Sequence, residues 1–135
     1  FTVNSSFQLE TTDNYADFDM NTAHSEGWNP GDLRGHFAEY KYYKQQYPNV
    51  KVLVSVGGWT RGENFHAMAL TASGRQTFIN SCIDFLKQYP FIDGIDLDWE
   101  YPGVDRRADY NDPYDRGCPG GPEDREKVSA EGYYS

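Results

Sequence analysis

The amino-acid sequence predicts an α/β fold in which helices and parallel strands alternate. Apolar residues recur at helical spacing in two segments, and a short strand-like run follows each of them. The connections are also long enough to bring the chain back to the same end of a sheet. Because strand–helix–strand crossovers are almost always right-handed, the two strands are expected to be parallel neighbours.

The first half of the chain is expected to contain one helix and one strand. Residues 1–30 mix polar residues, turn formers and scattered aromatic residues, which predicts a long loop. From Leu33 to Tyr47 the apolar and aromatic residues follow helical spacing, and Pro48 ends the pattern. Residues 51–56 are rich in valine and end at two glycines, which favours a strand buried on both faces, followed by a loop.

The second half contains the clearest helical pattern. Ser73 and Gln76 resemble a capping box, and the apolar helix face that follows ends before Pro90. Residues 91–101 alternate strictly after Gly94 and predict a second strand. A long acidic loop is expected over residues 102–122, with a further helix beginning near its end.

Two strands and two helices are too few to close an α/β barrel, which takes roughly 250 residues. The chain of 135 residues is therefore expected to form one segment of a (β/α)8 TIM barrel. Such a segment cannot bury both faces of its strands alone. Its expected partners therefore include the remainder of the barrel or further copies of the chain.

Composition and charge exclude several classes of function. The formal net charge of −9 would repel nucleic-acid phosphates and anionic membrane surfaces, so neither is an expected partner. No run approaches the ~20 apolar residues of a membrane-spanning helix. The two cysteines, Cys82 and Cys118, could form one disulfide, but Cys82 lies on an apolar helix face, which favours a buried thiol.

Three acidic residues, Asp96, Asp98 and Glu100, occupy alternate positions of the second strand and therefore project from one face. Neighbours two positions apart lie about 6 to 7 Å from each other. At an effective dielectric constant of about 20 they repel by roughly 2 kcal/mol, so one carboxyl group is expected to keep a proton near neutral pH. Glu100, at the carboxyl end of the strand, is the expected general acid, and the two aspartates would adjust its acidity.

Two other interpretations of these acids are less favoured. A solvated strand edge would not explain why Ile95, Leu97 and Trp99 on the opposite face need burial. A divalent cation site would suit clustered carboxylates, but no histidine accompanies them. The loop from Asp105 to Asp115 also lacks the glycine and glutamate positions of a calcium-binding loop. Neither a metal nor another cofactor is expected.

Two segments resemble motifs of the family 18 glycoside hydrolases, and within that family of the chitinases. Residues 93–102 (DGIDLDWEYP) resemble the catalytic-strand signature, and residues 55–59 (SVGGW) resemble the motif on the preceding barrel strand. The resemblance covers residues 1–127 and implies a partial catalytic domain, from the end of barrel strand 2 to the loop after strand 4. Residues 128–135 depart from the family pattern, with little apolar periodicity and an internal glycine, and their origin is left open.

The resemblance implies retaining, substrate-assisted hydrolysis of β-1,4 linkages between N-acetylglucosamine units in chitin or chitooligosaccharides. Glu100 would protonate the leaving oxygen while the carbonyl oxygen of the sugar's own 2-acetamido group attacks the anomeric carbon. Asp98 would hydrogen-bond the acetamido N–H, and Asp96 would share a proton with Asp98. An insoluble polymer as substrate implies a secreted, extracellular protein.

Residues around the acids are candidates for sugar binding. Ser55 is expected to face the same interior, although packing explains a small residue there equally well. Gly57 and Gly58 would let a sugar approach the backbone, or form only a turn. Trp59 and Tyr101 offer flat apolar faces suited to stacking on pyranose rings.

Two alternatives to a complete enzyme remain open. One is a chitin-binding, lectin-like module, as formed by family members that have lost the catalytic glutamate. The other is a catalytically incomplete fragment, because the strands that would supply the rest of the sugar cleft are not in this sequence. The presence of Glu100 favours chemistry over binding alone.

Overall fold

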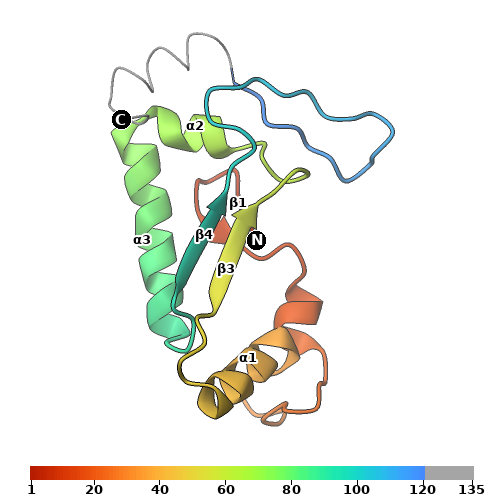
Figure 1. The fold of residues 1–135 in the computed structure, drawn as a ribbon, viewed down its shortest axis with the longest axis vertical. Coiled ribbons are helices and arrows are strands. Elements are labelled where there is room, and N and C mark those ends of the chain that lie inside the picture. The colour runs from red at the N-terminus through yellow and green to blue at the C-terminus, as the bar shows by residue number, and fades with distance from the viewer. Residues whose placement is uncertain (121–135) are drawn as a thin grey trace.

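The computed structural model describes residues 1–120, which fold around a two-stranded parallel sheet (Figure 1). The strands are β3 (Leu53–Gly57) and β4 (Gly94–Asp98), and Ser55 lies opposite Asp96 in their register. Their parallel pairing confirms the predicted crossover. Both strands are shorter than the sequence pattern suggested: β3 begins two residues later than expected and extends to Gly57, and β4 is shorter at both ends.

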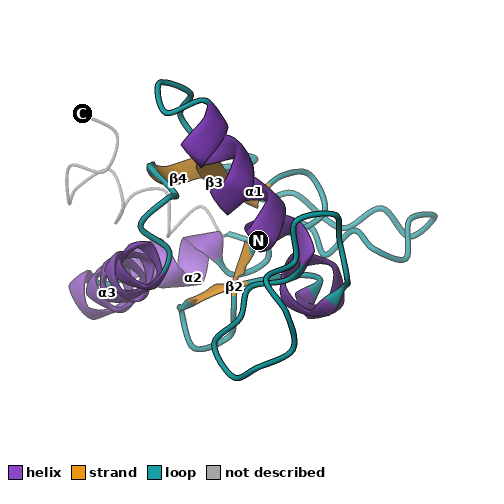
Figure 2. Cartoon of the chain, turned by 90° about the horizontal axis from the view of Figure 1, so that it is seen from below, coloured by secondary structure: helices purple, strands orange, loops and turns teal. Residues whose placement is uncertain are grey.

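Three α-helices accompany the sheet within residues 1–120: α1 (Gly35–Gln46), α2 (Phe65–Leu70) and α3 (Ala72–Gln88). The helices predicted before each strand are confirmed as α1 and α3. The short helix α2 lies where only a loop was expected. Figure 2 shows α2 and α3 lying together, apart from α1.

The start of α3 differs from the predicted capping box. Thr71 is the N-cap, and its hydroxyl accepts a hydrogen bond from the Gly74 N–H at 3.0 Å. Ser73 lies inside the helix, where its hydroxyl is 3.2 Å from that of Thr71. The expectation of a cap at Ser73 was wrong because threonine is also a favoured N-cap residue, and Thr71 lies two residues earlier.

The expected long loop over residues 1–30 contains short elements. The strands β1 (Thr2–Val3) and β2 (Leu9–Glu10) pair in antiparallel fashion, and a π-helix, η1, spans Tyr15–Asp19. The Asn4 side chain closes the hairpin turn by accepting hydrogen bonds from the Ser6 and Gln8 N–H groups, both at 2.9 Å. Elements this short are held by such local bonds and leave no hydrophobic period in the sequence.

The core lies on the apolar face of the sheet. Val54 and Val56 point into it from β3, whereas Leu53 and Ser55, which alternate with them, are exposed. The expectation that this strand is buried on both faces is therefore wrong for the described residues, which cover one face only. Buried apolar residues from the three helices, the chain start and the turn before β4 complete the core: Val3, Phe37, Phe65, Met68, Ala69, Phe78, Cys82 and Ile92.

Both cysteines are buried and free, so the disulfide alternative is not realised. Cys82 belongs to the core on α3, which confirms its interpretation as a small buried side chain. Burial raises the pKa of the Cys82 thiol to about 11, so it is neutral at physiological pH.

Two further expectations concern the ends of the chain and the membrane. Among residues 1–120, no helix combines the length and the apolar character that crossing a membrane requires. The helix expected near Pro122, and the distinct tail over residues 128–135, lie outside the described residues.

Candidate active site

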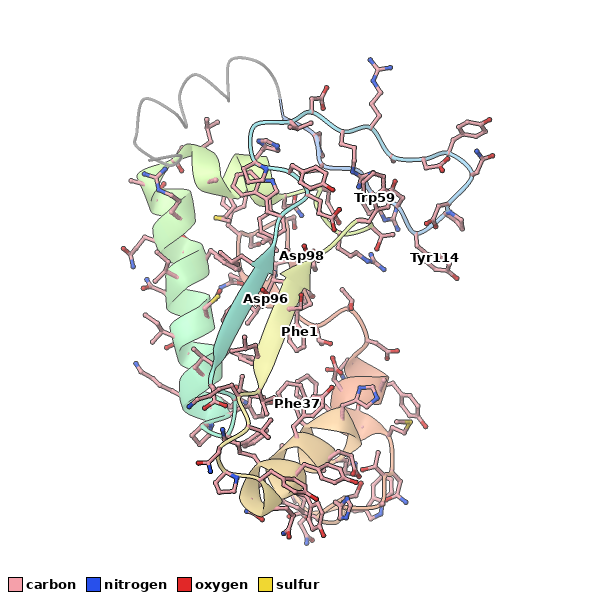
Figure 3. The ribbon with its side chains drawn as sticks, viewed as in Figure 1. Phe1, Phe37, Trp59, Asp96, Asp98 and Tyr114 are labelled. Atoms are coloured by element: carbon pink, nitrogen blue, oxygen red, sulfur yellow. The ribbon has the colours of Figure 1, made fainter. Side chains whose placement is uncertain are left out.

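The two motif segments lie side by side at the carboxyl ends of the strands. In the parallel register Ser55 is opposite Asp96 and Gly57 is opposite Asp98, so these four residues share one face of the sheet. Figure 3 shows the two aspartates following one another along β4. Both are exposed, and their face is the one that the core does not use.

Glu100 lies beyond the strand that was expected to carry it. β4 ends at Asp98, and Glu100 follows in a half-buried bend, with a cis peptide bond to Tyr101. The strict alternation that groups the two aspartates therefore stops before the glutamate. That Glu100 lies in one row with the two aspartates, and that it holds a proton, stay predictions.

The glycines at the end of β3 both have a positive φ, and close packing also requires the first of them. Gly57 has φ +104°, and a Cβ there would lie 2.5 Å from the Asp98 carbonyl oxygen and 2.6 Å from a ring carbon of Phe65. The N–H of Gly58 donates to the same Asp98 carbonyl at 2.8 Å. The pair thus has a structural role where β3 ends, and the approach of a sugar stays a prediction.

Trp99 belongs to the core, as the alternation predicted. Its ring stacks on Phe65 with centroids 5.4 Å apart, and its Nε1 donates to the Cys118 sulfur at 3.3 Å. Tyr101, two residues on, is 51% exposed and so presents an aromatic face near the end of the strand. The sequence therefore separated the packing aromatic from an accessible one.

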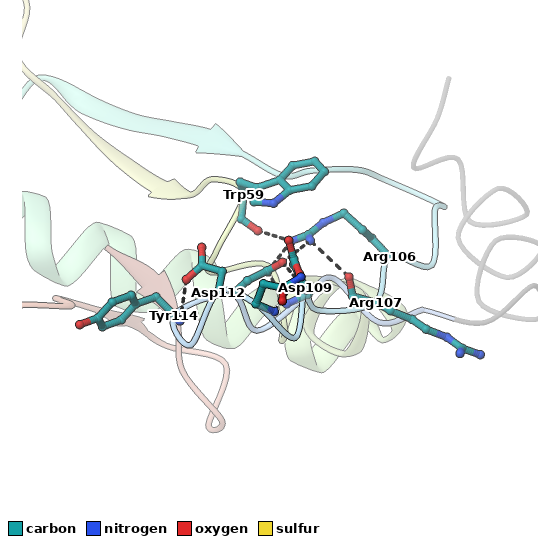
Figure 4. Close-up of polar contacts among 9 residues, drawn as sticks. Trp59, Arg106, Arg107, Asp109, Asp112 and Tyr114 are labelled. Carbon is teal, nitrogen blue, oxygen red and sulfur yellow. Dashed lines mark hydrogen bonds and ion pairs between the residues drawn. The ribbon is translucent and has the colours of Figure 1, made fainter.

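Trp59 has one face covered by a residue that sequence reasoning missed. The Arg106 guanidinium lies over the indole ring, 4.0 Å from its centroid, and also donates a hydrogen bond to the Trp59 carbonyl oxygen. The side chain of Trp59 is nevertheless half exposed. Figure 4 shows the arginine reaching back from the long loop to the tryptophan.

A buried carboxylate, Asp115, holds this arginine. It accepts from both terminal nitrogens of Arg106, at 2.8 and 2.9 Å, and from the backbone N–H groups of Asp109 and Gly117, each at 2.8 Å. The guanidinium keeps the pKa of Asp115 well below its ordinary range. The sequence offered no local signal for this pair, because the partners are nine residues apart in an irregular loop.

Within residues 1–120, no three His, Cys, Asp or Glu side chains are grouped so that they could hold a metal ion. The acidic residues of the long loop instead bond to its own backbone. For example, the Asp109 and Asp112 carboxylates accept from the N–H groups of Asn111 and Tyr114, both at 2.9 Å.

Comparison with known proteins identifies the family. The sequence model of the glycosyl hydrolases of family 18 matches residues 1–129. The chain belongs to glycosyl hydrolase family 18. Membership predicted from the two motifs is thereby confirmed.

Several similar members of family 18 are chitinases. Chitinase ChiA of Flavobacterium johnsoniae is 42% identical over 97 residues, which are 70% of this chain and 6% of that protein. Chitinase 1 of Aphanocladium album is 42% identical over 92 residues, or 67% of this chain and 21% of its relative. The chain thus spans less than a quarter of either relative.

A solved family 18 structure supports the same fold. Chitinase ChiA74 from Bacillus thuringiensis superposes with a TM-score of 0.71 at 34% identity, over 92% of this chain and 19% of that enzyme. The chain therefore adopts the fold of one part of a family 18 chitinase. The finer assignment, from the end of barrel strand 2 to the loop after strand 4, stays a prediction.

Proposed function

We propose that this chain supplies part of the catalytic cleft of an enzyme that hydrolyses β-1,4 linkages between N-acetylglucosamine units in chitin or chitooligosaccharides. The observation that carries the proposal is the register of β3 and β4 in a family 18 chain. It sets Ser55 and Gly57 directly against Asp96 and Asp98 on the face left open by the core. The names of the chitinase relatives support the choice of substrate.

The proposed chemistry is retaining and substrate-assisted. Glu100 donates its proton to the glycosidic oxygen as the bond to the anomeric carbon breaks, and the carbonyl oxygen of the 2-acetamido group forms the new bond to that carbon. Glu100, now a carboxylate, then takes a proton from the water that opens the cyclic intermediate. Two successive displacements at one carbon leave its configuration unchanged.

Asp98 and Asp96 are proposed to assist the acetamido group. Asp98 accepts a hydrogen bond from the acetamido N–H and offsets the positive charge that develops on the ring formed with the anomeric carbon. Asp96, two positions earlier on the same face, shares a proton with Asp98. The exposure of both carboxylates leaves them accessible to a ligand.

Sugar binding is proposed for the surrounding residues. Trp59 and Tyr101 are each about half exposed and offer aromatic faces to pyranose rings. Ser55, Gly57 and Gly58 would line the floor of the cleft beside the acids. Because chitin is an insoluble polymer, the enzyme is proposed to act outside the cell.

The test places this chain within a complete family 18 catalytic domain and measures chitooligosaccharide hydrolysis. Glu100→Gln is expected to lower kcat by about 10²- to 10⁴-fold, because the amide cannot donate the proton. Glu10→Gln, a matched change at an exposed position, is expected to leave kcat unchanged. NMR of the first product is expected to show the β-anomer. Hydrolysis that survives Glu100→Gln contradicts the proton-donor assignment.

The chain on its own gives the second arm of the test. Activity in the complete domain but not in the 135-residue chain identifies the chain as a catalytically incomplete part. Retention of the isolated chain on chitin without hydrolysis favours a lectin-like contribution. Inactivity of the complete domain on every N-acetylglucosamine oligomer would contradict the proposed substrate.

A further inference from the structure

The long loop after β4 is tied to the motif after β3 by a chain of specific contacts. Arg106 and Cys118 form an antiparallel bridge inside the loop, with backbone hydrogen bonds of 3.0 and 2.8 Å. The Arg116 N–H donates to the Thr60 carbonyl at 3.0 Å, directly after Trp59. The base of the loop is therefore fixed beside the tryptophan, although the two are far apart in the sequence.

Arg106 makes the contact with the tryptophan ring itself. The central carbon of its guanidinium lies over the indole, 4.0 Å from the ring centroid, while the same group donates to the Trp59 carbonyl. One residue thus holds both the ring and the backbone of Trp59. A planar guanidinium can stack and form a fork of hydrogen bonds at once, which a lysine ammonium cannot do.

The geometry of Arg106 is itself imposed by a buried partner. Asp115 has a fully buried side chain, forms a two-pronged ion pair with the arginine and uses its remaining acceptor capacity on loop N–H groups. Such bidentate pairs are stronger and more directional than single hydrogen bonds. The guanidinium is consequently held in place before any ligand arrives.

We infer that Arg106 is a positioning residue that fixes the Trp59 ring as a one-sided stacking platform for a sugar, with Asp115 locking the guanidinium against the covered face. The inference rests on the proposed function, because it takes an N-acetylglucosamine polymer as the ligand. The guanidinium occupies one face of the indole, and the half-exposed ring leaves the other for a pyranose. Since this contact orders a binding surface and not the reacting atoms, it acts on substrate affinity.

The experiment compares steady-state kinetics of variants in the complete catalytic domain. Arg106→Lys keeps the charge but loses the stacked fork, and is expected to raise KM for chitooligosaccharides about three- to tenfold with kcat nearly unchanged. Asp115→Asn keeps the size of the side chain but weakens the ion pair. It is expected to raise KM in the same way and so tests the inference through a second variant. Arg107→Lys is the matched control, because Figure 4 shows the Arg107 side chain pointing away from Trp59.

A double-mutant cycle with Trp59→Ala separates positioning from general stability. If Arg106 acts through the indole, Arg106→Lys adds no further rise in KM once the ring is removed. The part of the tryptophan fluorescence that disappears in Trp59→Ala is expected to be quenched more strongly by acrylamide in Arg106→Lys, because the covered face of the indole opens. Additive effects on KM in the cycle would overturn the inference. So would unchanged KM and quenching in both Arg106→Lys and Asp115→Asn.

The result for the unmodified domain distinguishes the two proposals. A domain that hydrolyses chitooligosaccharides while Arg106→Lys behaves like the Arg107→Lys control contradicts only the role of Arg106. A domain that neither binds nor hydrolyses them contradicts the proposed function, and with it the platform.

Discussion

Gly57 stands where β3 turns into its loop, and its missing side chain lets β4 and Phe65 pack against it. Its φ of +104° and the 2.5 Å distance from a Cβ to the Asp98 oxygen predict two costs for Gly57→Ala. The positive φ costs about 1–2 kcal/mol and the overlap about 1–3 more. We expect the free energy of unfolding to fall by about 2–5 kcal/mol in urea denaturation.

Gly31→Ala is the control, because Gly31 has a similar φ of +92° but no atom within 4 Å of a Cβ. It is expected to lower the free energy of unfolding only by the strain of the positive φ. Equal losses of unfolding free energy in the two variants would show that the contact of Gly57 with Asp98 and Phe65 adds nothing to stability.

At the scale of elements, Asp93 joins α1 to the starts of both strands. Its carboxylate lies 2.7 Å from the Lys44 ammonium and 3.3 Å from that of Lys51, and it accepts from the Val52 N–H at 2.8 Å. These contacts, led by the Lys44 hydrogen bond, lower the pKa of Asp93 from 3.8 to about 2. A carboxyl group whose pKa is lowered in the folded state stabilises the fold at pH values above its unfolded-state pKa. This stabilisation is lost as the pH falls through its folded-state pKa.

Asp93→Asn is therefore expected to lower the melting temperature at pH 7, with the difference from the unmodified chain shrinking between pH 4 and pH 2. Thermal unfolding followed by circular dichroism measures this difference in melting temperature across the pH range. Lys51→Ala removes the more exposed of the two lysines and is expected to have a smaller effect than Lys44→Ala. A difference that is independent of pH would contradict the ionic origin.

At the scale of the whole molecule, an apolar groove lies open between α3 and β4. Its volume is about 230 Å³, and Ile79, Ile83 and Leu97 on its walls are each about half exposed. The isolated chain is therefore expected to bind the apolar dye ANS. Ile83→Gln should weaken that binding, whereas Val50→Gln, at an exposed apolar residue outside the groove, should not.

The chain spans less than a quarter of its chitinase relatives, so we expect the remainder of a catalytic domain to cover this groove. ANS binding should then disappear in the complete domain. Association of the isolated chain that increases with concentration in sedimentation would instead favour further copies of the chain as the cover.

Part of the candidate site could be predicted from the sequence because it depends on local patterns. The period of two along residues 94–98 placed Asp96 and Asp98 on one face and directed Trp99 to the core. The long apolar stripe of α3 was equally clear, because many turns repeat the same signal. By contrast, α2 is too short to show a period, and the cap of α3 was assigned two residues late.

The sequence by itself determined the family, the order of the main helices and strands, and the alternation that groups the two aspartates, because neighbouring residues encode all of these. Only the tertiary structure decided that Arg106 covers Trp59, that Asp115 is buried beneath it, and that one face of the sheet stays open. The Arg106–Trp59 contact joins residues 47 positions apart. No periodicity records such a contact, because it depends on how the whole loop folds back on the sheet.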